Sequence, residues 1–126
     1  MPAYVVSRVQ KGLNDRRKPV NGSRVLVIGL SYKKNSNDAR ETPATGVISG
    51  LLKLGAEVYV HDSWAAAHIL DTVASRVDLT VDEVESADAV VVITDHDDTD
   101  WALVEDNAKW LLDTRNRLTA DNVESL

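Results

Sequence analysis

Cysteine is absent from this 126-residue sequence. Its absence excludes disulfides, thiolate metal sites and a cysteine nucleophile within the chain. No apolar run approaches the length that crosses a bilayer, and the opening residues, MPAYVVSRVQ, lack the apolar core of a signal peptide. We therefore expect a soluble, cytoplasmic protein with no membrane partner.

Basic residues do not outnumber acidic residues in the sequence. The chain has 14 Lys and Arg residues against 20 Asp and Glu residues, a net charge of −6. This balance argues against nucleic acid as the main partner, because duplex binding needs a basic surface. The basic side chains nevertheless gather in residues 1–40 and the acidic ones in the second half. An anionic small ligand near the basic half is one interpretation, and a solvated surface of varying sign is the other.

Alternating apolar runs and helical patterns predict the fold. Hydrophobic residues make up 44% of the sequence, which suits one globular domain with a core. The apolar runs VLVI and AVVVI predict strands at about 24–29 and 89–94 that are buried on both faces. We expect further strands at about 57–61, 76–80 and 110–113, and helices at about 3–13, 43–54, 64–73, 81–86 and 99–108.

This alternation predicts an α/β fold. We expect a Rossmann-like, three-layer, doubly wound parallel sheet of about five strands in the order 3-2-1-4-5, preceded by an N-terminal helix. Turn signals at Pro19 and Asn21-Gly22 mark a linker. We therefore divide the chain into a helix and linker at residues 1–22 and a domain at residues 23–126.

Residues 24–43, RVLVIGLSYKKNSNDARETP, join the first strand to a helix through a charged loop. Gly29 ends the strand, where the backbone must turn sharply or pass close to another group. Thr42 is a plausible helix cap, and Pro43 suits the first helical position. Ligands of open parallel sheets bind beyond the carboxyl ends of the strands, so the loop is the first place to look for a site.

A dinucleotide site is the obvious hypothesis for this loop. Gly29 after the first strand and Asp62 after the second are the skeleton of a dinucleotide-binding fingerprint. The G-x-G-x-x-G loop is missing, however, because Leu30, Ser31 and Tyr32 follow Gly29. Side chains then occupy the space that a pyrophosphate needs. We expect no unaided NAD binding of this kind, and we expect Asp62 to be a turn or cap residue.

Charged side chains offer another way to hold a phosphate. Lys33 and Lys34 supply point charges and Arg40 a forked donor, which Asp38 can orient. Tyr32 can stack on a base or pack in the core. Arg115 follows the last strand, at the same edge of the predicted sheet, and is a second candidate anion contact. The alternatives are a solvated basic loop and a surface arginine.

His96 lies among Asp95, Asp97 and Asp98, just after a buried strand. Such a cluster can bind a metal ion. Four consecutive polar residues cannot all converge on one ion, however, and we expect a solvated turn. No Ser–His–Asp or Cys–His arrangement is readable in the sequence.

The segment VLVIGLSYKKNSNDARETP closely resembles the UDP-glucose/GDP-mannose dehydrogenase family, specifically its C-terminal UDP-binding domain. The residues that match the family pattern in order and spacing are Gly29, Tyr32, Lys33, Asp38, Arg40, Thr42 and Pro43. The segments LLKLGAEVYVHD, ADAVVVITDH and LLDTRN continue the match. The opening PAYVV resembles the end of the family's connecting helix, so the resemblance covers essentially the whole chain.

The resemblance implies a function. Family members are NAD-dependent enzymes that oxidise the C6 alcohol of a nucleotide sugar to a carboxylate through a cysteine thioester, as in polysaccharide biosynthesis. It implies that Tyr32, Lys33 and Arg115 contact the UDP-sugar, and that Arg40 reaches NAD held mainly by an N-terminal domain. It also implies a homo-oligomer for the full-length enzyme.

The sequence departs from the family in lacking the N-terminal domain and the catalytic cysteine. A thioester cannot form without the thiol, so we expect no activity from this chain alone. We interpret it as the C-terminal nucleotide-sugar-binding domain of a UDP-sugar 6-dehydrogenase. The alternative is a stand-alone nucleotide-binding or dimerisation module without catalysis. UDP-glucose, UDP-N-acetylmannosamine, UDP-N-acetylglucosamine and GDP-mannose all remain open as the sugar substrate.

Overall fold

The computed structural model describes residues 2–30, 43–62 and 75–125 of the chain. Its sheet has the order β3-β2-β1-β4-β5-β6, and all neighbouring strands are parallel. The strands are β1 (Arg24–Ile28), β2 (Glu57–His61), β3 (Ser75–Arg76), β4 (Ala89–Val92), β5 (Leu111–Asp113) and β6 (Val123–Ser125). The helices are α1 (Pro2–Asp15), α2 (Pro43–Lys53), α3 (Val81–Ser86) and α4 (Trp101–Asn107). The predicted fold class and the order 3-2-1-4-5 are confirmed, with a sixth strand added at one edge.

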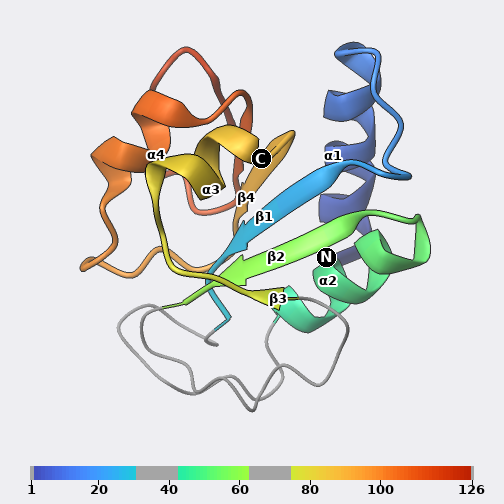
Figure 1. Ribbon diagram of the computed structural model, residues 1–126, viewed down its shortest axis with the longest axis horizontal. Coiled ribbons are helices and arrows are strands. Elements are labelled where there is room, and N and C mark those ends of the chain that lie inside the picture. The colour runs from blue at the N-terminus through green and yellow to red at the C-terminus, as the bar shows by residue number, and fades with distance from the viewer. Residues whose placement is uncertain (1, 31–42, 63–74, 126) are drawn as a thin grey trace.

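Helices cover both faces of the sheet (Figure 1). α1 and α2 lie on one face, and α3 and α4 lie on the other. Successive side chains of a strand point to opposite faces, so Val25 and Val27 enter the first core while Leu26 and Ile28 enter the second. This two-sided burial is the reason that β1 is apolar throughout.

The N-terminal helix α1 belongs to the first of these cores. Val5, Val9 and Leu13 recur at helical spacing and are buried against the sheet and α2. The Arg16 guanidinium lies over the Trp110 ring, 4.8 Å from its centroid. The helix predicted at 3–13 is therefore present, slightly longer than expected, and it packs on this domain.

The edge strands differ most from prediction. A strand was predicted at 76–80, but β3 comprises only Ser75–Arg76. Val77 still donates its N–H to Val60 O at 2.8 Å, and the chain then leaves the sheet toward α3, which Thr80 caps. β6 was not predicted, because its short, half-exposed sequence gives no strand pattern. The helix predicted at 64–73 lies outside the described residues. Among the helices that the structure describes, none has the length and apolar character to span a bilayer.

Asp88 joins the amino ends of β1 and β4. Its carboxylate accepts hydrogen bonds from the Arg24 N–H at 2.9 Å and from Lys18 Nζ at 2.6 Å. Its own N–H donates to Arg24 O at 2.7 Å. Burial by itself raises the pKa of Asp88, but the hydrogen bonds from Lys18 and Arg24 outweigh it and lower the pKa below its usual value.

Asp88 should therefore stabilise the fold in a pH-dependent way. Because its pKa is lower in the folded chain, its contribution is fully present above the unfolded value of about 3.9 and is lost as pH falls through the folded value. Asp88→Asn should lower the free energy of unfolding by about 1 kcal/mol near neutral pH, measured by urea unfolding. The difference from the unsubstituted chain should shrink as the pH is lowered below about 4.

The exposed Asp106 of α4 supplies a matched control. Asp106→Asn should leave the urea midpoint nearly unchanged across the same pH series. A stability difference for Asp88→Asn that stays constant over the series would contradict the role given to its carboxylate.

Candidate functional site

The carboxyl ends of the parallel strands meet along one side of the sheet, here called the carboxyl edge. Buried polar residues gather there: Asp62, Thr94, His96, Thr99 and Asp113. Ser23, the remaining buried polar residue of the described chain, lies at the opposite edge, where the amino ends of the strands meet. Burying polar groups costs free energy unless they are paired, so this concentration marks the carboxyl edge as the candidate site.

Gly29 turns the chain sharply where β1 ends. Its φ is +102°, and a Cβ at this position would lie 2.4 Å from the Thr94 backbone nitrogen. The N–H groups of Ile93 and Thr94 both donate to Ile28 O, at 2.9 and 3.3 Å. The close approach predicted for Gly29 is therefore to the chain's own backbone at the end of β4, which fills the space beside the glycine.

Asp62 and His96 form a buried pair beside the end of β1. Asp62 Oδ2 accepts the Leu30 N–H at 2.6 Å and lies 3.0 Å from His96 Nε2. The exposed fractions of Asp62 and His96 are 2% and 1%. His96 O also accepts a hydrogen bond from Trp101 Nε1 at 3.0 Å. The pair thus fixes Leu30, the residue that opens the loop carrying Lys33.

These contacts correct one prediction. The solvated turn expected around His96 is wrong for His96 itself, which lies in the interior against Asp62. The turn or cap role expected for Asp62 involves residues outside the described ranges and stays a prediction, but Asp62 also accepts the Leu30 N–H and pairs with His96. The pairing was not predicted, because the partners are more than 30 residues apart in sequence and meet only through the sheet order. Within the described ranges, no group of three or more His, Cys, Asp or Glu residues is placed to hold a metal ion.

Arg115 follows β5 at the carboxyl edge, as predicted. Its Nε donates to Ile93 O at 2.9 Å, and Asp95 Oδ1 lies 3.8 Å from the same nitrogen. The side chain is 39% exposed. In the part of the chain that the structure describes, neither terminal nitrogen of Arg115 has a hydrogen-bond partner. This leaves a planar fork of donors that suits phosphate or carboxylate.

Arg117, which no sequence pattern marked, is already paired. Its Nη1 donates to Asp97 Oδ1 at 2.9 Å and to Asp95 O at 3.1 Å. Its guanidinium lies over the Trp101 ring, 5.2 Å from the centroid. The hydrogen bond to Asp97 raises the pKa of Arg117 above its usual value. Arg117 therefore links the loop after β4 to the loop after β5. Of these two arginines, Arg115 is the one whose terminal nitrogens can bind a ligand.

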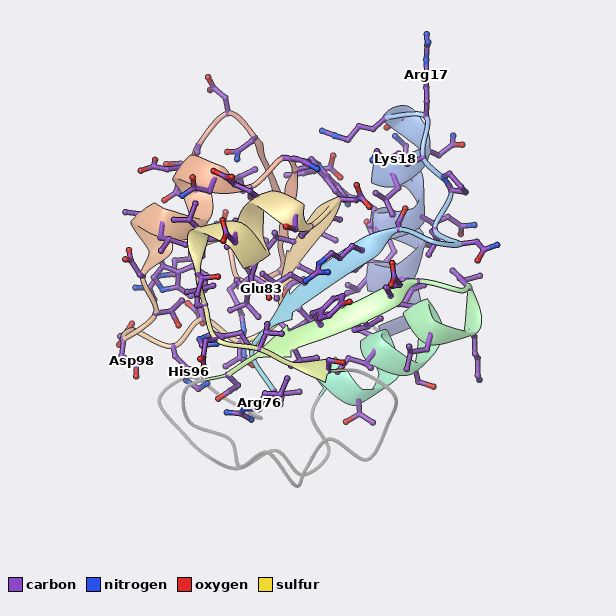
Figure 2. The ribbon with its side chains drawn as sticks, in the orientation of Figure 1. Arg17, Lys18, Arg76, Glu83, His96 and Asp98 are labelled. Atoms are coloured by element: carbon purple, nitrogen blue, oxygen red, sulfur yellow. The ribbon has the colours of Figure 1, made fainter. Side chains whose placement is uncertain are left out.

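Arg76 is a further cation that sequence reasoning missed. Figure 2 shows it near His96 at the carboxyl edge, whereas Arg17 and Lys18 lie at the opposite end of the molecule. Arg76 Nη2 donates to Asp62 O, so the β3 side of the sheet also helps to fix the end of β2. No sequence signal marked Arg76, since it stands alone in a short edge strand.

The loop residues with predicted roles in binding, in orienting Arg40 or in capping the helix lie outside the described residues: Tyr32, Lys33, Lys34, Asp38, Arg40 and Thr42. Their roles stay predictions. The structure does place Leu30, where that loop begins, and Arg115 on either side of the end of β4, because the strand order is β1-β4-β5. A ligand that bridges the two loops would lie beyond Ile93 and Thr94.

Ligands of open parallel α/β sheets bind beyond the carboxyl ends of the strands, which is where the Arg115 fork lies. Residues 26–120 match the model of the UDP-glucose/GDP-mannose dehydrogenase family, UDP binding domain. The chain belongs to this family and corresponds to that domain, so the resemblance seen in the sequence is confirmed.

The relatives are dehydrogenases of nucleotide sugars. A UDP-N-acetyl-D-glucosamine 6-dehydrogenase from Pseudomonas aeruginosa is 40% identical over 67 residues, which is 53% of this chain and 16% of that protein. A UDP-glucose 6-dehydrogenase from Rickettsia bellii is 28% identical over 134 residues, covering 99% of this chain and 30% of that protein. The structure of an NDP-N-acetyl-D-galactosaminuronic acid dehydrogenase from Methanosarcina mazei aligns with a TM-score of 0.81 and 28% identity, covering 99% of this chain and 29% of that one. The chain thus spans less than a third of the length of these relatives.

The contact between Gly29 and Thr94 yields a stability prediction. Gly29→Ala places a methyl group against the Thr94 backbone at a strained positive φ. We expect it to lower the free energy of unfolding by about 3 kcal/mol or more in urea unfolding. Gly22→Ala is the matched control, because Gly22 also has a positive φ of +82° but nothing lies within 4 Å of its added Cβ.

Gly22→Ala should cost only the backbone strain, about 1 kcal/mol. Equal losses for the two variants would show that the approach of Thr94 adds nothing.

Proposed function

We propose that this chain binds the UDP part of a nucleotide sugar at the carboxyl edge and works as the nucleotide-sugar-binding domain of an NAD-dependent UDP-sugar 6-dehydrogenase. The observation that carries the proposal is the Arg115 guanidinium, held at Nε by Ile93 O with a terminal fork that has no partner among the described residues. The membership of the UDP binding domain family supports the choice of ligand.

The chemistry of a nucleoside diphosphate fits this edge. A diphosphate presents several oxygens with negative charge, and Arg115 offers two donor nitrogens in one plane. The proposal adds Lys33 as a second cation and Tyr32 as a contact to the UDP-sugar, both from the loop that Leu30 opens. The buried pair Asp62–His96 anchors the start of that loop. In this proposal Lys33 and Arg115 bind the diphosphate together.

The described residues do not fit a complete NAD site. The space beside Gly29, where a dinucleotide's pyrophosphate would approach the backbone, is filled by Thr94. The proposal therefore assigns NAD mainly to a separate domain and gives this chain only Arg40 as a contact to it. Because the chain also has no cysteine, we assign it binding and orientation of the substrate and no step of the oxidation.

The wider proposal follows the family resemblance seen in the sequence. It includes a homo-oligomeric, cytoplasmic full-length enzyme with no nucleic acid or membrane partner. It also divides the chain into the end of a connecting helix with its linker, residues 1–22, and the UDP-sugar-binding domain, residues 23–126. The alternative is a nucleotide-binding or dimerisation module without catalysis, which is consistent with the absence of cysteine from the chain.

Calorimetric titration of the chain with UDP and with NAD at low salt tests the proposal. UDP should bind, and NAD alone should not. Arg115→Ala and Lys33→Ala should each weaken UDP binding about tenfold or more, because each removes a charged contact to the diphosphate. Lys109→Ala is the control, since Lys109 is exposed just before β5 at the opposite edge and its removal should leave the affinity unchanged.

Absence of UDP binding, or unchanged affinity in Arg115→Ala, would contradict the proposed site. Catalysis needs a separate test, in which the chain is mixed with a separately produced N-terminal domain of a relative and a UDP-sugar. NADH production that depends on this chain supports the dehydrogenase proposal, and UDP binding without any NADH production favours the module without catalysis.

A further inference from the structure

We propose that Asp113 is a positioning residue for ligand binding, which acts through Arg115. Asp113 lies two residues before Arg115, at the end of β5, and its side chain is buried in the interior. The inference rests on the proposed function, because it concerns how the Arg115 fork is presented to the diphosphate.

The Asp113 carboxylate is held by backbone groups. Its Oδ1 accepts the Arg115 N–H at 2.8 Å, and its Oδ2 accepts the N–H groups of Arg117 at 2.6 Å and Leu118 at 2.7 Å. The side chain is 0% exposed. Within the described ranges no cationic side chain forms an ion pair with it, so these amides satisfy the buried charge. Such an arrangement fixes the path of the backbone from Arg115 to Leu118.

The same turn is fixed at its start by β4. Thr114 donates to Val92 O from both its N–H, at 3.2 Å, and its Oγ1, at 2.6 Å. Asn116 adopts a left-handed backbone conformation with a φ of +58°. A non-glycine residue adopts this conformation at a cost, and the hydrogen bonds to Asp113 on both sides of Asn116 offset it. The turn is therefore built around the carboxylate.

Arg115 is consequently held at both ends. Asp113 fixes its backbone, and Ile93 O accepts the hydrogen bond from its Nε. A long side chain normally loses rotamer freedom on binding, and this loss weakens the affinity. Because Arg115 is already ordered, it loses less rotamer entropy on binding, and the affinity for a diphosphate is higher. Asp113 thus contributes to binding without contact to the ligand.

The chemistry of the position calls for a carboxylate. An asparagine of nearly the same size has only one acceptor oxygen and an NH₂ group. In Asp113→Asn that NH₂ group would face a backbone N–H of Arg115, or those of Arg117 and Leu118. The turn would then shift, and the Arg115 fork would lose its fixed position.

A double-mutant cycle tests the inference by UDP titration of the 126-residue chain. The four proteins are the unsubstituted chain, Asp113→Asn, Arg115→Ala and the double variant. Asp113→Asn should weaken UDP binding about tenfold. The double variant should bind within about twofold of Arg115→Ala, because a residue that acts through Arg115 has no effect once Arg115 is removed.

Asp88→Asn is the matched control for loss of stability. Asp88 is also a carboxylate that accepts a backbone N–H, but at the opposite edge of the sheet. It should lower the midpoint of urea unfolding and leave the UDP affinity within about twofold of the unsubstituted chain.

The outcomes separate this inference from the proposed function. Additive losses in the double variant, or unchanged affinity in Asp113→Asn, would overturn the role of Asp113 alone. Unchanged affinity in Arg115→Ala, or no UDP binding by the unsubstituted chain, would overturn the proposed function and this inference with it.

If Asp113→Asn does not fold, amide hydrogen exchange of the unsubstituted chain tests the role of Asp113. The Arg115, Arg117 and Leu118 N–H groups should be as protected in the free chain as those of β5, and UDP should increase their protection. Exchange at the rate of an exposed turn, or protection that UDP does not change, would overturn the inference.

Discussion

Backbone N–H groups that lie beyond the ends of parallel strands need acceptors, and buried carboxylates supply them at the carboxyl edge. Asp62 accepts the Leu30 N–H after β1, and Asp113 accepts the N–H groups of Arg115, Arg117 and Leu118 after β5. Both carboxylates lie in the interior, where an unsatisfied charge would be costly. The two loops of the candidate site therefore start from fixed points, and the arrangement of the site depends on these two acids.

The sheet order decides which loops can act together. β4 lies between β1 and β5, so the loops that follow β1 and β5 flank its end. Gly29 and Thr94 close the gap between β1 and β4, and Ile93 O anchors Arg115 from the β4 side. Helices cover both faces of the sheet, and the carboxyl ends of its strands meet beyond them. In our proposal, the fold thus positions a binding site at this edge, and this chain takes no part in the oxidation itself.

Much of this fold could be predicted from local patterns. The apolar runs of β1 and β4 and the helical spacing in α1 and α2 are local signals, and they sufficed for the strand order and for the location of Arg115 at the carboxyl edge. The pairing of Asp62 with His96 could not be predicted, because only the sheet order brings these distant residues together. β6 was missed since it is short and carries a polar residue at its centre. The available signal for the anchoring role of these acids was their position at strand ends, with Asp62 directly after β2 and Asp113 as the last residue of β5, and it was not used.

The central claim is that UDP binds at the carboxyl edge of the sheet. The most direct test is a UDP titration of the ¹⁵N-labelled chain, followed through its backbone amide resonances. The account predicts that the amides of Leu30, Thr94 and Arg115 shift together with one saturation curve, while those of Arg24 and Lys109 at the opposite edge stay in place. Shifts confined to the opposite edge or to the outer surface of α1, or no shifts at saturating UDP, would contradict the account.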